Sequence, residues 1–198
     1  MSCWFIQILF PVILLSIVVP LYNDHVNLIR FLEHLNMEGC SEVSEIIFID
    51  DGSNERYDSI LTGSKFHNYA LLRQTNGKQG KARNTGIDNS KGQYIWFVDV
   101  DDKISTNQIN IVTEAIYESA NNDVIFFDAV CKDKILKSNL PDLDRGGILK
   151  RLSLNTLTVA AWNKIYSRDF LVSNNIRFIE DRKFGDLYFS IKTCVLMK

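Results

Sequence analysis

The sequence has no cluster of cysteines or histidines and no block of basic residues. None of its four cysteines forms a Cys-x-x-Cys pair, and its three histidines make no metal-ligand spacing with them. These absences argue against a structural zinc site and against a disulfide scaffold, so we expect reduced thiols in a cytoplasmic chain. The net charge of −2, without a basic run, gives no support to nucleic-acid binding.

Glycine-rich phosphate loops are also missing from the start of the chain. A Gly-x-Gly-x-x-Gly segment after the first strand would indicate a dinucleotide dehydrogenase, and a Gly-rich loop there would indicate a nucleotide-sugar pyrophosphorylase. Neither is present, and there are no internal repeats or low-complexity linkers. The 198 residues, 46% hydrophobic and 23% charged, are ordinary for one globular domain with a substantial core.

The N-terminal segment, residues 1–22, carries no charge and is largely apolar. Its length would suit a signal peptide or a membrane span, but it lacks a basic start, and Pro11 and Pro20 interrupt it. We therefore expect its second half to form the first strand, ending at Pro20. Residues 1–12 remain as an apolar extension, for which contact with a membrane is the alternative.

Buried-strand and amphipathic-helix patterns alternate along the rest of the chain. The pattern predicts strands at 13–19, 45–49, 69–72, 94–98, 124–127 and 159–166. It predicts helices at 25–37, 56–65, 80–90, 106–120, 148–155, 169–173 and 184–197, with a charged loop at 131–147. This β-α-β-α order predicts an α/β, Rossmann-like fold with a mostly parallel sheet covered by helices on both faces.

Two predicted strands run directly into carboxylates. Strand 94–98 is followed by Asp99, Asp101 and Asp102, and strand 45–49 by Asp50 and Asp51. If the strands are parallel, these groups meet at one edge of the sheet, where open α/β folds bind ligands. Crowded carboxylates need a counter-charge, and a hard divalent cation holding a phosphate-bearing substrate would supply it. The alternative is a pair of acidic surface turns.

Six segments, taken in order, resemble family 2 glycosyltransferases with the GT-A fold, and the resemblance covers about residues 13–195. The segments are Ser16-Ile17-Val18-Val19-Pro20-Leu21-Tyr22-Asn23, Ile49-Asp50-Asp51-Gly52-Ser53, residues 76–86, Val98-Asp99-Val100-Asp101-Asp102, Trp162-Asn163-Lys164-Ile165-Tyr166 and Gly185-Asp186-Leu187-Tyr188-Phe189. The resemblance implies one GT-A domain at 13–198. Its nucleotide-binding half would be 13–102, and its acceptor and catalytic half 103–198.

The resemblance also implies the contacts of a nucleotide-sugar donor. The donor would be contacted by Pro20, Tyr22, Asn23, Asp50, Asp51, Gly77, Lys81, Arg83, Asp99 and Val100. Within this set, Tyr22 would stack on the base, and Lys81 and Arg83 would meet the phosphates. Asp101 and Asp102 would bind Mn²⁺ or Mg²⁺. The residues alone also allow an aromatic packed at a strand end, a turn with a helix cap at 50–51 and a solvated basic loop.

The resemblance also implies that Asp186 is the catalytic base. It would take the proton of an acceptor hydroxyl that attacks the anomeric carbon, with inversion of configuration. Trp162 would form the floor of the acceptor site. From the residues alone, Asp186 could instead be a helix N-cap, and Trp162 a buried core residue.

The resemblance thus implies an inverting transferase that moves a sugar from a UDP-sugar to a hydroxyl acceptor. The expected setting is surface polysaccharide or glycolipid assembly at the cytoplasmic side of a membrane, with peripheral membrane association. Two departures stand against this: Gly185 stands where the family has glutamate, and the chain stops soon after the catalytic helix begins. No Gln-x-x-Arg-Trp segment is present, which argues against a processive polysaccharide synthase. The alternative is a catalytically inactive or truncated nucleotide-sugar-binding protein. A receiver-type signalling domain is disfavoured because its acidic pair would follow the first strand.

Overall fold

The computed structural model describes residues 12–35, 43–63, 68–119, 121–131, 134–136, 147, 150, 160–180 and 185–197. The expected extension lies outside these residues except for Val12. Most of the expected loop at 131–147 and of the expected helix at 148–155 lies outside them as well.

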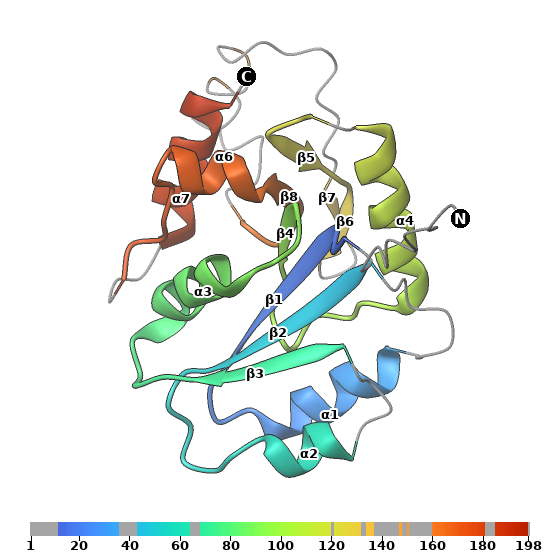
Figure 1. The fold of residues 1–198 in the computed structure, drawn as a ribbon, viewed down its shortest axis with the longest axis vertical. Helices are drawn as coiled ribbons and strands as arrows, with labels where there is room; N and C mark the ends of the chain where they lie inside the picture. Colours follow the sequence, from blue (N-terminus) through green and yellow to red (C-terminus); the bar gives the residue numbers. More distant parts are fainter. Residues whose placement is uncertain are drawn as a thin grey trace, which may run out of the picture.

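The described residues form a six-stranded sheet with the order β3-β2-β1-β4-β8-β5 (Figure 1). The strands are β1 (Leu15–Leu21), β2 (Ser44–Asp50), β3 (Tyr69–Arg73), β4 (Tyr94–Phe97), β5 (Val124–Phe126) and β8 (Lys164–Ser167). Strands β1 to β4 pair in parallel, whereas β8 is antiparallel to both β4 and β5. The predicted mostly parallel α/β sheet is confirmed, with one reversed strand. A separate antiparallel pair joins β6 (Ala129–Cys131) to β7 (Lys134–Leu136).

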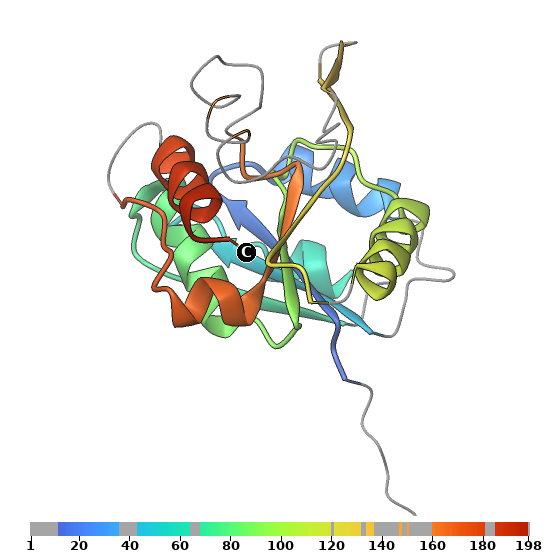
Figure 2. The same cartoon turned by 90° about the horizontal axis from the view of Figure 1, so that it is seen from above.

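Helices cover both faces of the sheet, as predicted, and the alternation of side chains along β1 shows which helices lie on which face. Ile17 and Val19 belong to one core cluster, with α1 (His25–His34), α2 (Asp58–Thr62) and α4 (Thr106–Glu118). Val18 belongs to the other, with α3 (Lys78–Asn89), α6 (Arg168–Ser173) and α7 (Gly185–Leu196). Figure 2 shows the sheet between these two layers.

The close packing of α3 on β1 depends on Gly86. A Cβ atom at this position would lie 2.2 Å from Val18 Cγ1, closer than side chains can approach. The glycine therefore lets the helix lie directly on the central strand. This contact fixes α3 beside the carboxyl end of β1, where the candidate site lies.

Helix and strand bounds mostly agree with the predicted ones to within a few residues. Among the described residues, the prediction of a charged loop at 131–147 was wrong where β7 and the end of β6 lie, because these two segments pair with each other as an antiparallel ladder. The strand predicted at 159–166 also starts late, since β8 begins at Lys164 and Ala161 to Asn163 form a turn before it. No described helix has both the length and the apolar character needed to cross a membrane.

Candidate functional site

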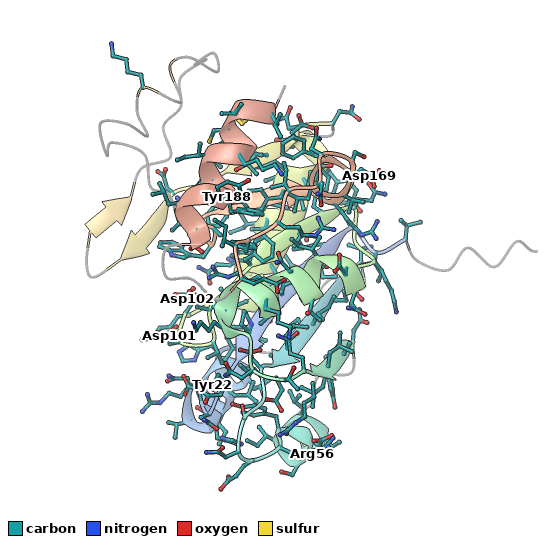
Figure 3. The ribbon with its side chains drawn as sticks, turned by 90° about the vertical axis from the view of Figure 1, so that its left-hand side faces the viewer. Tyr22, Arg56, Asp101, Asp102, Asp169 and Tyr188 are labelled. Carbon is teal, nitrogen blue, oxygen red and sulfur yellow. The ribbon has the colours of Figure 1, made fainter. Side chains whose placement is uncertain are left out.

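A pocket of about 420 Å³ opens at the carboxyl ends of β1 and β2, beside the start of α3. It is lined by Pro20, Leu21, Tyr22, Asp51, Asn76, Lys78, Gln79 and Ala82. Three of the predicted donor residues, Pro20, Tyr22 and Asp51, are among them. Tyr22 is 54% exposed, so it is not packed at a strand end. Figure 3 shows Tyr22 on the same side of the molecule as Asp101 and Asp102.

The two acidic residues at the end of β2 have different surroundings. Asp50 is buried, and its carboxylate accepts hydrogen bonds from Ser53 N at 2.9 Å and Arg73 Nη1 at 3.0 Å. Asp50 therefore stabilises the turn after β2, which agrees with the turn that the residues alone allow at 50–51. Asp51 is also buried, but it lines the pocket while accepting from Gln74 Nε2 at 2.6 Å and Gly77 N at 3.0 Å.

The turns after β1 and β2 are joined to each other. Asn23, at φ +50°, donates from its backbone N–H to Ser53 Oγ at 2.9 Å, and its side chain accepts from Asn54 N at 2.8 Å. Gly52 has φ +79°, and a Cβ there would lie 2.9 Å from Asn76 N. A glycine is needed at this position both for the backbone conformation and for the close approach. Asn23 thus shapes the rim of the pocket from outside its lining.

The glycine-rich segment reaches the pocket through residues that were not predicted as donor contacts. Lys81, the predicted phosphate contact, is half-buried and directs its Nζ to Thr75, 3.5 Å from both Oγ1 and the carbonyl oxygen. The pocket is lined instead by Asn76, Lys78 and Gln79, on either side of Gly77. Lys78 and Gln79 stand between Gly77 and Gly80 at the start of a helix, with Asn76 just before, and this was the signal that could have identified them.

The acidic segment after β4 lies beside this lining. The Asp99 carboxylate accepts from Gln79 Nε2 at 2.7 Å and from Arg83 Nη2 at 2.8 Å. Asp101 is exposed, whereas Asp102 is half-buried and accepts from Asp99 N at 3.2 Å. Burial, together with the negative charges of Asp99 and Asp101, raises the pKa of Asp102 to about 6. The Val100 side chain is buried in the core, so only its backbone could meet a ligand.

The predicted metal ligands, Asp101 and Asp102, offer only part of the coordination that a hard cation requires. Among the described residues, no three His, Cys, Asp or Glu side chains come together as a metal site. Mn²⁺ and Mg²⁺ do not need such a cage when a substrate diphosphate and water complete their coordination. Asp101 and Asp102 are neighbouring oxygen donors whose crowding a cation would relieve. They therefore fit a metal held jointly with a substrate.

Asp186 lies in the first turn of α7, one residue inside the helix, and is not its N-cap. Its Oδ1 accepts from Arg83 Nη1 at 2.5 Å and its Oδ2 from Ala161 N at 3.5 Å, while 31% of the side chain is exposed. Asp186 is thus held in place but still accessible, as a group must be if it is to receive a proton from a substrate.

Arg83 joins the two acidic groups. Its side chain is only 2% exposed, and its two terminal nitrogens are bound by Asp99 and Asp186. The guanidinium carbon also lies 5.2 Å from the centre of the Phe178 ring. This arrangement differs from the predicted phosphate contact of Arg83. It creates a continuous network from the pocket residue Gln79 through Asp99 and Arg83 to Asp186.

The turn before β8 closes the site near Asp186. Trp162 is half-buried, not a core residue, and its carbonyl oxygen accepts from Trp96 Nε1 at 2.8 Å. Lys164 is buried and donates to Ala160 O at 2.6 Å and Asn163 Oδ1 at 2.9 Å. Burial lowers the pKa of Lys164 to about 8, although the negative charge of Asp186 acts in the opposite direction. The acceptor role of Trp162 stays a prediction.

Comparison with known proteins gives one family. The family model described as "Glycosyl transferase family 2" matches residues 16–172. The chain is 31% identical over 182 residues to "Uncharacterized glycosyltransferase YibD" of Escherichia coli K12, covering 83% of this chain and 52% of that protein. It is 25% identical over 169 residues to "Poly(ribitol-phosphate) beta-N-acetylglucosaminyltransferase TarP" of Staphylococcus aureus, covering 82% and 51%.

The same fold occurs in a solved structure of S. aureus TarS, residues 1–349, in complex with UDP-GlcNAc. The TM-score is 0.75 at 21% sequence identity, and the match covers 93% of this chain and 54% of that one. At this identity the likeness establishes the fold alone, and it confirms the GT-A architecture. The chain spans about half the length of the curated relatives it matches.

Proposed function

Because this chain belongs to glycosyl transferase family 2, we propose that it transfers a sugar from a UDP-sugar to an acceptor hydroxyl, with inversion. The observation that carries the proposal is the network that joins the pocket to Asp186 through Asp99 and Arg83. Only the Arg83 side chain separates the candidate base, Asp186, from Asp99 at the candidate donor site. The TarS structure with UDP-GlcNAc makes that sugar nucleotide the first donor to test.

The donor would lie along the carboxyl edge of the sheet. Tyr22 offers an exposed ring for stacking on the base, and Asp51 offers a carboxylate that could accept from a base N–H. Lys78, at the pocket, carries a positive charge suited to the diphosphate. Asp99, which lies beside the pocket and accepts from its lining residue Gln79, would accept from the ribose hydroxyls. The other three assignments rest on position in the pocket and on the chemistry of each group.

Asp101 and Asp102 would hold Mn²⁺ or Mg²⁺, and when bound the cation would neutralise charge on the departing nucleoside diphosphate. The chain's own contribution is to place these carboxylates side by side after β4. Asp102 is half-buried, with its carboxylate accepting from Asp99 N. Asp101 is exposed and can turn toward a ligand.

In the transfer step, Asp186 takes the proton from the acceptor hydroxyl as its oxygen forms a bond to the anomeric carbon. The bond from that carbon to the diphosphate oxygen breaks, and its electron pair leaves with the nucleoside diphosphate. Attack from the face opposite the leaving group inverts the configuration. Trp162 would support the acceptor, because flat apolar sugar faces pack on aromatic rings. The setting we propose is surface polysaccharide or glycolipid assembly at the cytoplasmic side of a membrane.

Calorimetric titration with UDP, with and without Mn²⁺, tests the donor site, and UDP release from UDP-GlcNAc tests turnover. The proposal expects metal-dependent binding and release of UDP, even with water as the acceptor. Binding without release from any UDP-sugar, with or without added acceptors, would favour the inactive sugar-nucleotide binder. No binding by a folded sample would overturn the proposed donor site.

A further inference from the structure

Arg83 is among the largest fully buried side chains of the described residues, with 1% of its surface exposed. A buried guanidinium is stable only if its charge is paired. Here the two terminal nitrogens meet two carboxylates that come from different ends of the fold, Asp99 after β4 and Asp186 on α7. Both contacts are charge-assisted hydrogen bonds, which are the stronger kind.

The surroundings of Arg83 hold it in place. The next residue, Asn84, is buried and exchanges two hydrogen bonds with the Phe178 backbone, at 3.0 Å and 2.9 Å. The Phe178 ring in turn faces the guanidinium of Arg83 and stacks on Phe189 of α7, with centroids 3.9 Å apart. The arginine, a residue of α3, is therefore held against the segment that leads to α7.

We propose that Arg83 is a positioning residue that acts through Asp99 and Asp186 and is not a ligand of the donor phosphates. The inference rests on the proposed function and assigns the arginine of that same site. To reach a phosphate, the guanidinium would have to leave two carboxylates and expose a charge that is buried at present. In its observed place it sets the orientation of the ribose-contacting carboxylate and of the base at the same time.

The two roles differ in what they predict for uridine and for UDP. A phosphate ligand contributes to UDP binding but not to uridine binding, because uridine has no phosphate. A residue that orients Asp99 toward the ribose contributes equally to both. The ratio of the two dissociation constants therefore separates a phosphate ligand from a positioning residue.

The experiment measures binding of UDP and, by competition, of uridine to the wild-type chain and to Arg83→Met and Arg83→Lys. Arg177→Met is the matched control, since Arg177 pairs with the exposed Asp88, outside the site. We expect Arg83→Met to weaken both ligands by the same factor, within twofold. At saturating UDP-GlcNAc, it should lower the rate of UDP release at least 100-fold, with partial recovery in Arg83→Lys. The control should match the wild type in all three measurements.

Loss of UDP affinity at least tenfold greater than loss of uridine affinity would overturn the inference and establish a phosphate ligand. An unchanged rate of UDP release in Arg83→Met would overturn it as well. Thermal unfolding identifies a variant that fails to fold, and the comparison of UDP with uridine then passes to Arg83→Lys, which keeps the charge. Failure of the wild-type chain to bind UDP would instead count against the proposed function.

Discussion

Asp99 and Asp186 accept hydrogen bonds from the same guanidinium, that of Arg83, although one follows a central strand and the other lies in the first turn of the last described helix. A single buried cation thus holds together the predicted donor carboxylate and the predicted base. This relationship connects the two halves of the site, and it gives the proposed chemistry a physical basis in the chain itself.

Asp101→Asn should weaken Mn²⁺-dependent UDP binding about tenfold or more, which is about 1.4 kcal/mol. The reason is that the exposed Asp101 carboxylate would be one of two protein ligands of the metal, and an amide is a weaker ligand of a hard cation. Calorimetric titration with UDP at fixed Mn²⁺ measures the change. Asp88→Asn, which changes an exposed aspartate outside the site, is the control. Equal affinities for Asp101→Asn and the wild type would remove Asp101 from the metal site.

Tyr22→Ala should weaken UDP binding about tenfold, since stacking of a base on an aromatic ring contributes roughly 1–3 kcal/mol. The ring is 54% exposed, so its loss should change the free energy of unfolding little. Tyr117→Ala is the matched control, because that ring is also exposed but lies on α4, outside the pocket lining. If both variants bound UDP as the wild type does, the base would lie elsewhere.

Gly86→Ala should destabilise the fold by about 1–3 kcal/mol, because the added methyl group would overlap Val18 on the central strand. Urea unfolding gives the free energy directly. Gly63→Ala is the comparison, since its Cβ would meet only the carbonyl oxygens of its own helix α2, at 3.3 Å or more. Equal stabilities of the two variants would show that α3 does not pack on β1 as closely as described.

The buried Lys164 gives a prediction for pH. Its pKa is about 8 in the folded chain against 10.5 for the free side chain, so the unfolded chain binds more protons between these values. Stability from this group therefore rises with pH across that window, by up to about 1.4 kcal/mol per pH unit. Lys164→Met should lose the rise.

The buried Cys194 acts against this effect, because burial raises the pKa of its thiol to about 11 and its contribution to stability falls above pH 9. Urea unfolding at pH 7.5 and pH 9.5 should therefore compare Lys164→Met with its parent in a Cys194→Ala background. The free energy of unfolding of the parent, minus that of Lys164→Met, should be larger at pH 9.5 than at pH 7.5. An identical difference at both pH values would contradict a depressed pKa for Lys164.

Local patterns in the sequence predicted the parts of the site that follow single strands. Asp51 and Asp99 stand directly after runs of buried residues, and parallel strands bring their carboxyl ends to one edge. The turn considered at 50–51 is present, and Gly52 in it has a φ of +79°, the conformation that only glycine adopts readily. Each of these features depends on neighbours in the chain.

The features that depend on distant partners were not predicted. Arg83 and Asp186 are separated by 103 positions, and nothing near Arg83 in the chain indicates that it is buried. The reversal of β8 is likewise set by its place between β4 and β5, not by its own four residues. The late start of β8 leaves Trp162 in a turn, where its carbonyl oxygen accepts from the distant Trp96 side chain instead of from a neighbouring strand.

The most direct test of a transferase that uses Asp186 is UDP release from UDP-GlcNAc by the wild-type chain and by Asp186→Asn, each saturated with donor and Mn²⁺. UDP binding is measured on the same two samples. We predict that Asp186→Asn binds UDP as the wild type does, while its rate of release falls by about 10²–10⁴-fold. Wild-type turnover in Asp186→Asn would contradict it.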